Sequence, residues 1–99
     1  MHRLVLGLVL GLLGGTAQAA DPERGLQLAR TWCAQCHIVA PGDAGSDAGP
    51  PFSVVAGSLE SDGESLRQWL LAPHEPMPFL DLADPEVDDL RAYIQSLAP

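Results

Sequence analysis

Residues 33 to 37 read CAQCH, and this pentapeptide constrains the fold more than any other feature of the 99-residue chain. Its two thiols are the only cysteines in the sequence, so they react either with each other or with a group from outside the chain. The rest of the chain must hold two sulfurs and an imidazole close together in a fixed order. Three chemistries use such a cluster: a disulfide, a metal site and covalent attachment of haem.

The N-terminal sequence MHRLVLGLVLGLLGGTAQAA is typical of a secretory signal. Basic Arg3 precedes an uncharged apolar stretch, and Ala17 and Ala19 form an A-x-A cleavage pattern. The stretch is shorter than the about 20 apolar residues of a membrane-spanning helix. We therefore expect residues 1–19 to be a cleaved signal peptide and residues 20–99 to form one periplasmic domain. Membrane contact is expected only through the signal, before it is removed.

The charge of the chain limits the class of partner. The sequence has 13 acidic residues, five arginines and no lysine, with a formal net charge of −8 at pH 7. Binding to a phosphate backbone needs clustered Lys and Arg. We therefore expect no nucleic acid partner.

Three helices and no strand are predicted after the signal. Each helix begins with a recognisable cap, at Asp21-Pro22, at the capping box of Ser61 and Glu64, and at Asp84-Pro85. The first helix runs to the pentapeptide, Pro73 ends the second, and an apolar stripe places the third over residues 85–97. Loops rich in Gly, Pro and Asp are predicted over residues 38–52 and 72–83. The fold class is therefore all-α.

This helical pattern separates the chemistries of the pentapeptide. A thioredoxin-like site has C-x-x-C at the start of a helix that follows a strand, whereas these cysteines follow a helix. A zinc site needs four ligands, and the candidates are Cys33, Cys36, His37 and His74, of which adjacent Cys36 and His37 are poorly placed for one ion. A plain disulfide is compatible with secretion but gives His37 no role. Haem attachment uses all three side chains, with thioethers at Cys33 and Cys36 and His37 on the iron.

The second axial ligand of such an iron has two candidates, both in the segment PHEPMPFL. Met77 lies between Pro76 and Pro78, where the backbone is stiff and extended. A thioether ligand also suits electron transfer, because it raises the reduction potential. We predict Met77 as the ligand and His74 as a surface residue.

With these residues the chain resembles the monohaem class I c-type cytochromes, in particular the short bacterial type. The resemblance extends over nearly all of residues 20–99. Its motifs are CAQCH after an N-terminal helix, Gly49-Pro50, Met77-Pro78 and a closing helix with DLRAYIQSL. It implies a small cytochrome c fold, in which three main helices, with the first and last crossed, pack around one covalently bound haem c and its iron.

The resemblance also implies two finer contacts. The carbonyl group of Pro50 is expected to accept the second ring proton of His37, although adjacent Pro51 leaves open which carbonyl serves. Gly25 is expected to let Tyr93 approach closely where the first and last helices cross.

The function expected on these grounds is a soluble periplasmic electron carrier that catalyses nothing by itself. Its expected partners are redox proteins, such as a dehydrogenase or an oxidase with a basic docking patch, because the chain is acidic. Two alternatives stay open. One is a haem enzyme or sensor with a labile sixth ligand, such as a peroxidase, and the other is a thiol-disulfide oxidoreductase that uses Cys33 and Cys36.

Overall fold

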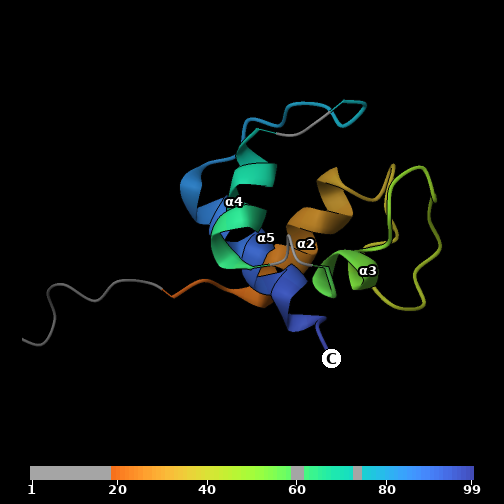
Figure 1. Cartoon of the computed structure of the whole chain (residues 1–99), viewed down its shortest axis with the longest axis horizontal. Helices are drawn as coiled ribbons and strands as arrows, with labels where there is room; N and C mark the ends of the chain where they lie inside the picture. The colour runs from red at the N-terminus through yellow and green to blue at the C-terminus, as the bar shows by residue number, and fades with distance from the viewer. Residues whose placement is uncertain (1–18, 59–61, 73–74) are drawn as a thin grey trace, which may run out of the picture.

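The computed structural model describes residues 19–58, 62–72 and 75–99. These ranges contain four helices and no strand: α2 (Pro22–Trp32), α3 (Phe52–Ala56), α4 (Gly63–Leu71) and α5 (Asp84–Ser96). Helix α5 contacts each of the other three and lies among them in Figure 1. The all-α prediction is confirmed, while residues 1–18 of the expected signal lie outside the described ranges. Within those ranges, no helix is long and apolar enough to cross a bilayer.

Helix α2 begins where its sequence predicts and leads into the pentapeptide. The side chain of Asp21 accepts hydrogen bonds from the amides of Glu23 and Arg24, at 2.9 and 3.4 Å. Pro22 occupies the first helical position, where a missing N–H has no cost. At the other end, the amide of Cys33 donates to the carbonyl oxygen of Ala29 at 2.8 Å. Cys33 is therefore held by the last turn of the helix.

The crossing of α2 and α5 confirms the expected contact between the first and last helices. A Cβ atom on Gly25 would lie only 2.7 Å from the Cβ of Tyr93 and from the carbonyl carbon of Asp89. The two backbones therefore touch without a side chain between them. The buried carboxylate of Asp89 adds a second connection, because it accepts from the amide of Asp21 at 2.7 Å and lies 3.6 Å from the guanidinium of Arg24.

Three expectations about the helices need correction. Helix α3 was not predicted, because five residues are too few to show a helical period. The cap of α4 is Asp62, whose carboxylate accepts from the amide of Ser65 at 3.0 Å, and the expected cap at Ser61 lies outside the described residues. The predicted cap at Asp84 is also wrong, because α5 begins at Asp84 and its N-cap is Ala83, whose amide donates to the carboxylate of Glu86 at 2.9 Å.

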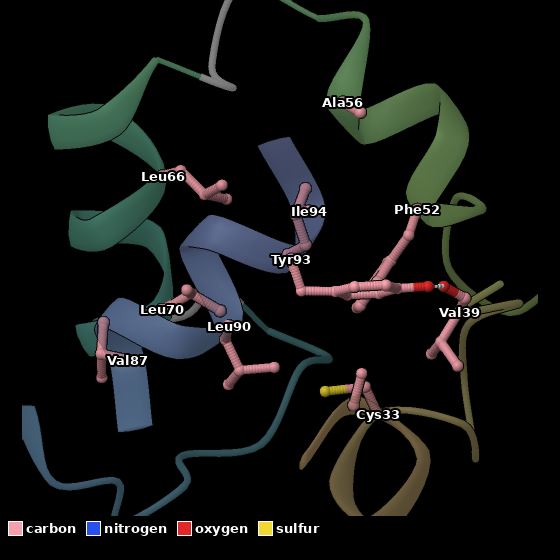
Figure 2. Close-up of a cluster of buried hydrophobic side chains, with 11 residues drawn as sticks. Cys33, Val39, Phe52, Ala56, Leu66, Leu70, Val87, Leu90, Tyr93 and Ile94 are labelled. Carbon is pink, nitrogen blue, oxygen red and sulfur yellow. Dashed lines mark hydrogen bonds between the residues drawn. The ribbon is translucent and has the colours of Figure 1, made fainter. Parts of the chain in front are cut away.

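The hydrophobic core lies between α5 and the other three helices (Figure 2). The predicted stripe of α5 is buried, with Val87, Leu90 and Ile94 at most 1% exposed. Burial of a side chain of this size contributes roughly 1.5–3 kcal/mol, so the stripe accounts for much of the helix packing. Cys33 belongs to the same core, and its sulfur points inward from the end of α2. The core thus includes one residue of the pentapeptide.

Candidate functional site

The pentapeptide forms a tight turn at the end of α2. The amides of Cys36 and His37 both donate to the carbonyl oxygen of Cys33, at 3.2 and 3.0 Å. Both thiols are free, the first buried and the second exposed. The turn therefore presents two sulfurs with different surroundings, and the imidazole of His37 follows them directly in the chain.

Burial changes the chemistry of the first thiol. Removal from water disfavours the thiolate and raises the pKa of Cys33 to about 11. Redox-active C-x-x-C sites instead have a lowered thiol pKa, because the thiolate is the nucleophile. This environment argues against the thiol-disulfide oxidoreductase alternative.

The His37 ring has a defined orientation and a defined tautomer. Its Nδ1 lies 2.7 Å from the carbonyl oxygen of Pro50. A carbonyl can only accept, so Nδ1 carries the proton and the neutral ring keeps its electron pair on Nε2. The neighbouring carbonyl of Pro51 is occupied by the amides of Val54 and Val55, at 2.9 and 3.1 Å. Of the two prolines, Pro50 therefore provides the carbonyl that faces the ring.

Gly49 and Phe52 both lie close to the same ring. A Cβ atom on Gly49 would lie 2.5 Å from Cε1 and 2.9 Å from Nδ1 of His37, so only glycine lets the ring lie against this backbone. The amide of Gly49 also donates to the carbonyl oxygen of Cys36 at 2.6 Å. The ring centroids of Phe52 and His37 lie 5.0 Å apart, and the two ring planes are tilted by 48°. The sequence contained Gly49 in a recognised motif, but nothing in it indicated a contact with the imidazole.

The segment after His37 is anchored to α5 and α3. The hydroxyl of buried Tyr93 donates to the carbonyl oxygen of Val39 at 2.6 Å (Figure 2). The amide of Phe52 donates to the carbonyl oxygen of Ile38 at 2.9 Å. Burial raises the pKa of Tyr93, so the hydroxyl stays protonated and remains a donor. Sequence reasoning placed Tyr93 at the crossing but missed this bond, which the rule that a buried tyrosine hydroxyl needs a partner could have suggested.

The predicted sixth ligand lies in another part of the chain. Met77 is half-buried on the loop that joins α4 to α5, while His74 lies outside the described residues. In the described ranges, no three His, Cys, Asp or Glu side chains are grouped so as to hold a metal ion. The structure thus brings Cys33, Cys36, His37 and Pro50 together and leaves Met77 on a separate loop.

The donor set fits a haem. Two free thiols separated by two residues suit the two vinyl groups of a porphyrin. The imidazole beside them has its Nδ1–H engaged and its Nε2 electron pair available to an iron. A thioether such as that of Met77 is the second ligand used in cytochromes of the c type.

Comparison with known proteins gives two relatives. The chain is 41% identical to Cytochrome c-552 of Bradyrhizobium diazoefficiens over 104 aligned residues, which cover 100% of both chains. It is 35% identical to Cytochrome c oxidase subunit 2 of Alkalihalophilus pseudofirmus over 77 residues, which are 66% of this chain and 22% of that subunit. No family model and no solved structure matches the chain.

Proposed function

This chain belongs to the monohaem class I c-type cytochromes, and we propose that Cys33 and Cys36 hold its haem c while His37 and Met77 ligate the iron. It is an electron-transfer protein and not an enzyme. The bound haem supplies an iron that accepts and releases one electron. The observation that carries the ligand assignment is the 2.7 Å contact between Nδ1 of His37 and the carbonyl oxygen of Pro50.

The residues around His37 determine how that ligand behaves. The Pro50 carbonyl holds the Nδ1 proton, which fixes the tautomer and makes Nε2 a stronger donor. Gly49 and Phe52 restrict rotation of the ring. Hydrogen bonds from Tyr93 and Phe52 fix the backbone just beyond it. The fold therefore orients the ring of the proposed ligand.

Met77 is proposed to determine which oxidation state is favoured. A thioether is a soft ligand and stabilises ferrous iron more than ferric iron, which raises the reduction potential. Its position between Pro76 and Pro78 restricts the backbone that presents the sulfur. A closed sixth position also disfavours the alternative of a small-ligand sensor or peroxidase.

We further propose that the domain works in the periplasm after removal of residues 1–19. The A-x-A pattern at Ala17 and Ala19 supports this location. The proposed partners are redox proteins such as a dehydrogenase or an oxidase. The similarity to a segment of an oxidase subunit supports an oxidase as one such class.

The test is covalent attachment. Protein produced with a c-type maturation system should carry one haem that survives acid-acetone extraction, because thioether bonds do not dissociate as coordination bonds do. The variant with both Cys33→Ala and Cys36→Ala should release its haem in the same extraction. Extractable haem in the unmutated protein would contradict the assignment.

Carbon monoxide distinguishes the electron carrier from the haem enzyme. The ferrous protein at neutral pH should not bind carbon monoxide, because Met77 occupies the sixth position. Met77→Ala provides the positive control, since it opens that position. Rapid binding by the unmutated protein would favour the enzyme or sensor instead.

A further inference from the structure

The buried carboxylate of Asp89 on α5 receives few donors for a charge inside a protein. Asp89 is 4% exposed, and a buried charge is costly unless it is paired and hydrogen-bonded. One oxygen accepts from the amide of Asp21 at 2.7 Å. The other lies 3.6 Å from the guanidinium of Arg24, which is longer than a hydrogen bond, and the Arg24 side chain is 56% exposed. The carboxylate can therefore accept a further hydrogen bond from a cation.

The start of the proposed mature chain lies at this carboxylate. With residues 1–19 removed, Ala20 is the first residue and Asp21 the second, and the amide of Asp21 already donates to Asp89. The nitrogen of Ala20 precedes that amide by one residue, and successive Cα atoms are about 3.8 Å apart. A hollow of about 350 Å³ lies at this point, lined by Ala19, Ala20, Asp21, Pro22 and Arg24. The nitrogen of Ala20 is thus close to Asp89 and beside open space in which it can turn.

Cleavage of the signal changes the charge of this nitrogen. In the precursor it belongs to a neutral peptide bond. Hydrolysis adds water across the bond between Ala19 and Ala20, so the carboxyl group leaves with Ala19 and the new amine of Ala20 is mostly protonated at pH 7. Cations are disfavoured near the N-terminus of a helix, because the helix dipole is positive there. The ammonium is therefore stable at the start of α2 only where carboxylates outweigh the dipole.

We propose that the ammonium of Ala20, formed when the signal is removed, binds Asp89 and fastens the start of the mature chain to α5. The contact adds a charge-assisted hydrogen bond where α2 and α5 cross. The precursor cannot form this ion pair, because its peptide N–H carries no charge. Cleavage therefore stabilises the mature domain relative to the precursor. The inference rests on the proposed cleavage after Ala19.

The experiment uses the absence of lysine from the sequence, which makes the α-amino group of Ala20 the one amine of the mature chain. Acetylation removes its charge, whereas reductive dimethylation keeps the charge and one N–H donor. Both products are made from the mature haem-loaded protein, whose first residue is identified by mass spectrometry. Thermal unfolding is then followed by circular dichroism. Acetylation should lower Tm by about 4–8 °C, the shift that a modest charge-assisted contact gives in a domain of this size, and dimethylation by less than about 2 °C.

Substitution of Asp89 tests the acceptor. Asparagine keeps an oxygen for the amide of Asp21 but has no negative charge, so acetylation of Asp89→Asn should change Tm by less than about 2 °C. Asp47→Asn is the matched control, because it removes an exposed acid of the 38–51 loop and should leave the full effect of acetylation.

A second variant keeps the test decisive if Asp89→Asn does not fold. A glycine inserted between Ala19 and Ala20 moves the ammonium one residue farther from Asp89, by about 3.8 Å along the chain. Acetylation of this protein should change Tm by less than about 2 °C. A full acetylation effect would show that the position of the ammonium does not matter.

Several other outcomes would overturn the contact. An unchanged or raised Tm on acetylation would show that Asp89 does not hold the ammonium and that the helix dipole dominates. Equal losses on acetylation and dimethylation would show that bulk matters and charge does not. A full acetylation effect in Asp89→Asn would place the ammonium against another carboxylate. A mature chain that begins at another residue would overturn the proposed cleavage together with the contact, so the two failures are distinguishable.

Discussion

Replacement of Gly25 by alanine should destabilise the protein, although alanine is the better helix former. In an ordinary helix interior the change from Gly to Ala stabilises by about 1 kcal/mol. At the crossing of α2 and α5, however, the new Cβ would lie 2.7 Å from the Cβ of Tyr93 and from the carbonyl carbon of Asp89. Non-bonded carbon atoms favour a separation of about 3.5 Å or more, so the contact is about 0.8 Å too short.

The two helices must move apart to remove this overlap. The cost of that movement decides whether the substitution stabilises or destabilises the protein. One of the two close atoms belongs to the backbone of α5 and cannot rotate away as a side-chain end can. Overpacking of a core typically costs about 1–3 kcal/mol and more where nothing can relax. The gain of about 1 kcal/mol in helix propensity offsets part of this overpacking cost. We therefore expect the free energy of unfolding to fall by about 2 kcal/mol. For a domain of this size the loss lowers Tm by roughly 10 °C.

The assay is urea unfolding of the haem-loaded protein, followed by far-ultraviolet circular dichroism and by haem absorbance together. Gly63→Ala is the matched control, because a Cβ there meets the end of the flexible Arg91 side chain at 3.3 Å, which can move. The control should change stability by less than about 0.5 kcal/mol, as a surface substitution does. If Gly25→Ala is as stable as the unmutated protein or more so, α2 and α5 do not cross as closely as the 2.7 Å contacts at Gly25 require.

Two further predictions concern the site. Met77→Ala should abolish the weak red sulfur-to-iron absorption band of the oxidised protein and lower its reduction potential, because the soft ligand that favours ferrous iron is lost. His74→Ala is the control and should leave the band intact. If the band survives in Met77→Ala, Met77 is not the ligand. Tyr93→Phe should lower the free energy of unfolding by about 1–3 kcal/mol at pH 7, because the buried Val39 carbonyl loses its donor. The raised pKa of Tyr93 means that the folded protein favours the neutral phenol, so the stability that the hydroxyl contributes is complete below about pH 10 and is lost as the pH rises further. Urea titrations should therefore show a stability difference between the unmutated protein and Tyr93→Phe that shrinks above about pH 10. A difference that grows above about pH 10 would contradict this prediction.

The sequence was informative wherever a short local pattern carries the physics. The Asp21-Pro22 start of α2 and the apolar stripe of α5 were predictable, because capping and helical periodicity involve residues within a few positions of each other. The chemistry of the pentapeptide was equally accessible, since its three reactive groups are near neighbours in the chain. Helix α3 was not, because its five residues carry no period of their own.

What could not be predicted from residues alone are contacts between distant segments. Asp89 is acidic and lies in the polar first half of its helix, yet it is buried against the amide of Asp21, 68 positions away. The hydroxyl of Tyr93 reaches Val39 across 54 positions. Such partners are determined by the way the helices cross. The position of a carboxylate or hydroxyl in the sequence does not indicate which distant group it will contact.

The chemistry of the site was predictable from a local pattern, whereas its geometry depends on contacts between distant segments. CAQCH identifies the groups that react, but their orientation depends on residues outside the pentapeptide. Gly49, Pro50 and Phe52 contact the His37 ring. That set of contacts depends on the 38–51 loop returning to the end of α2, and Tyr93 of α5 holds the start of this loop. The helix crossing at Gly25 positions α5, so a substitution there should disturb the axial ligand as well as stability. A lower reduction potential in Gly25→Ala than in Gly63→Ala would show that the helix crossing affects the iron ligand.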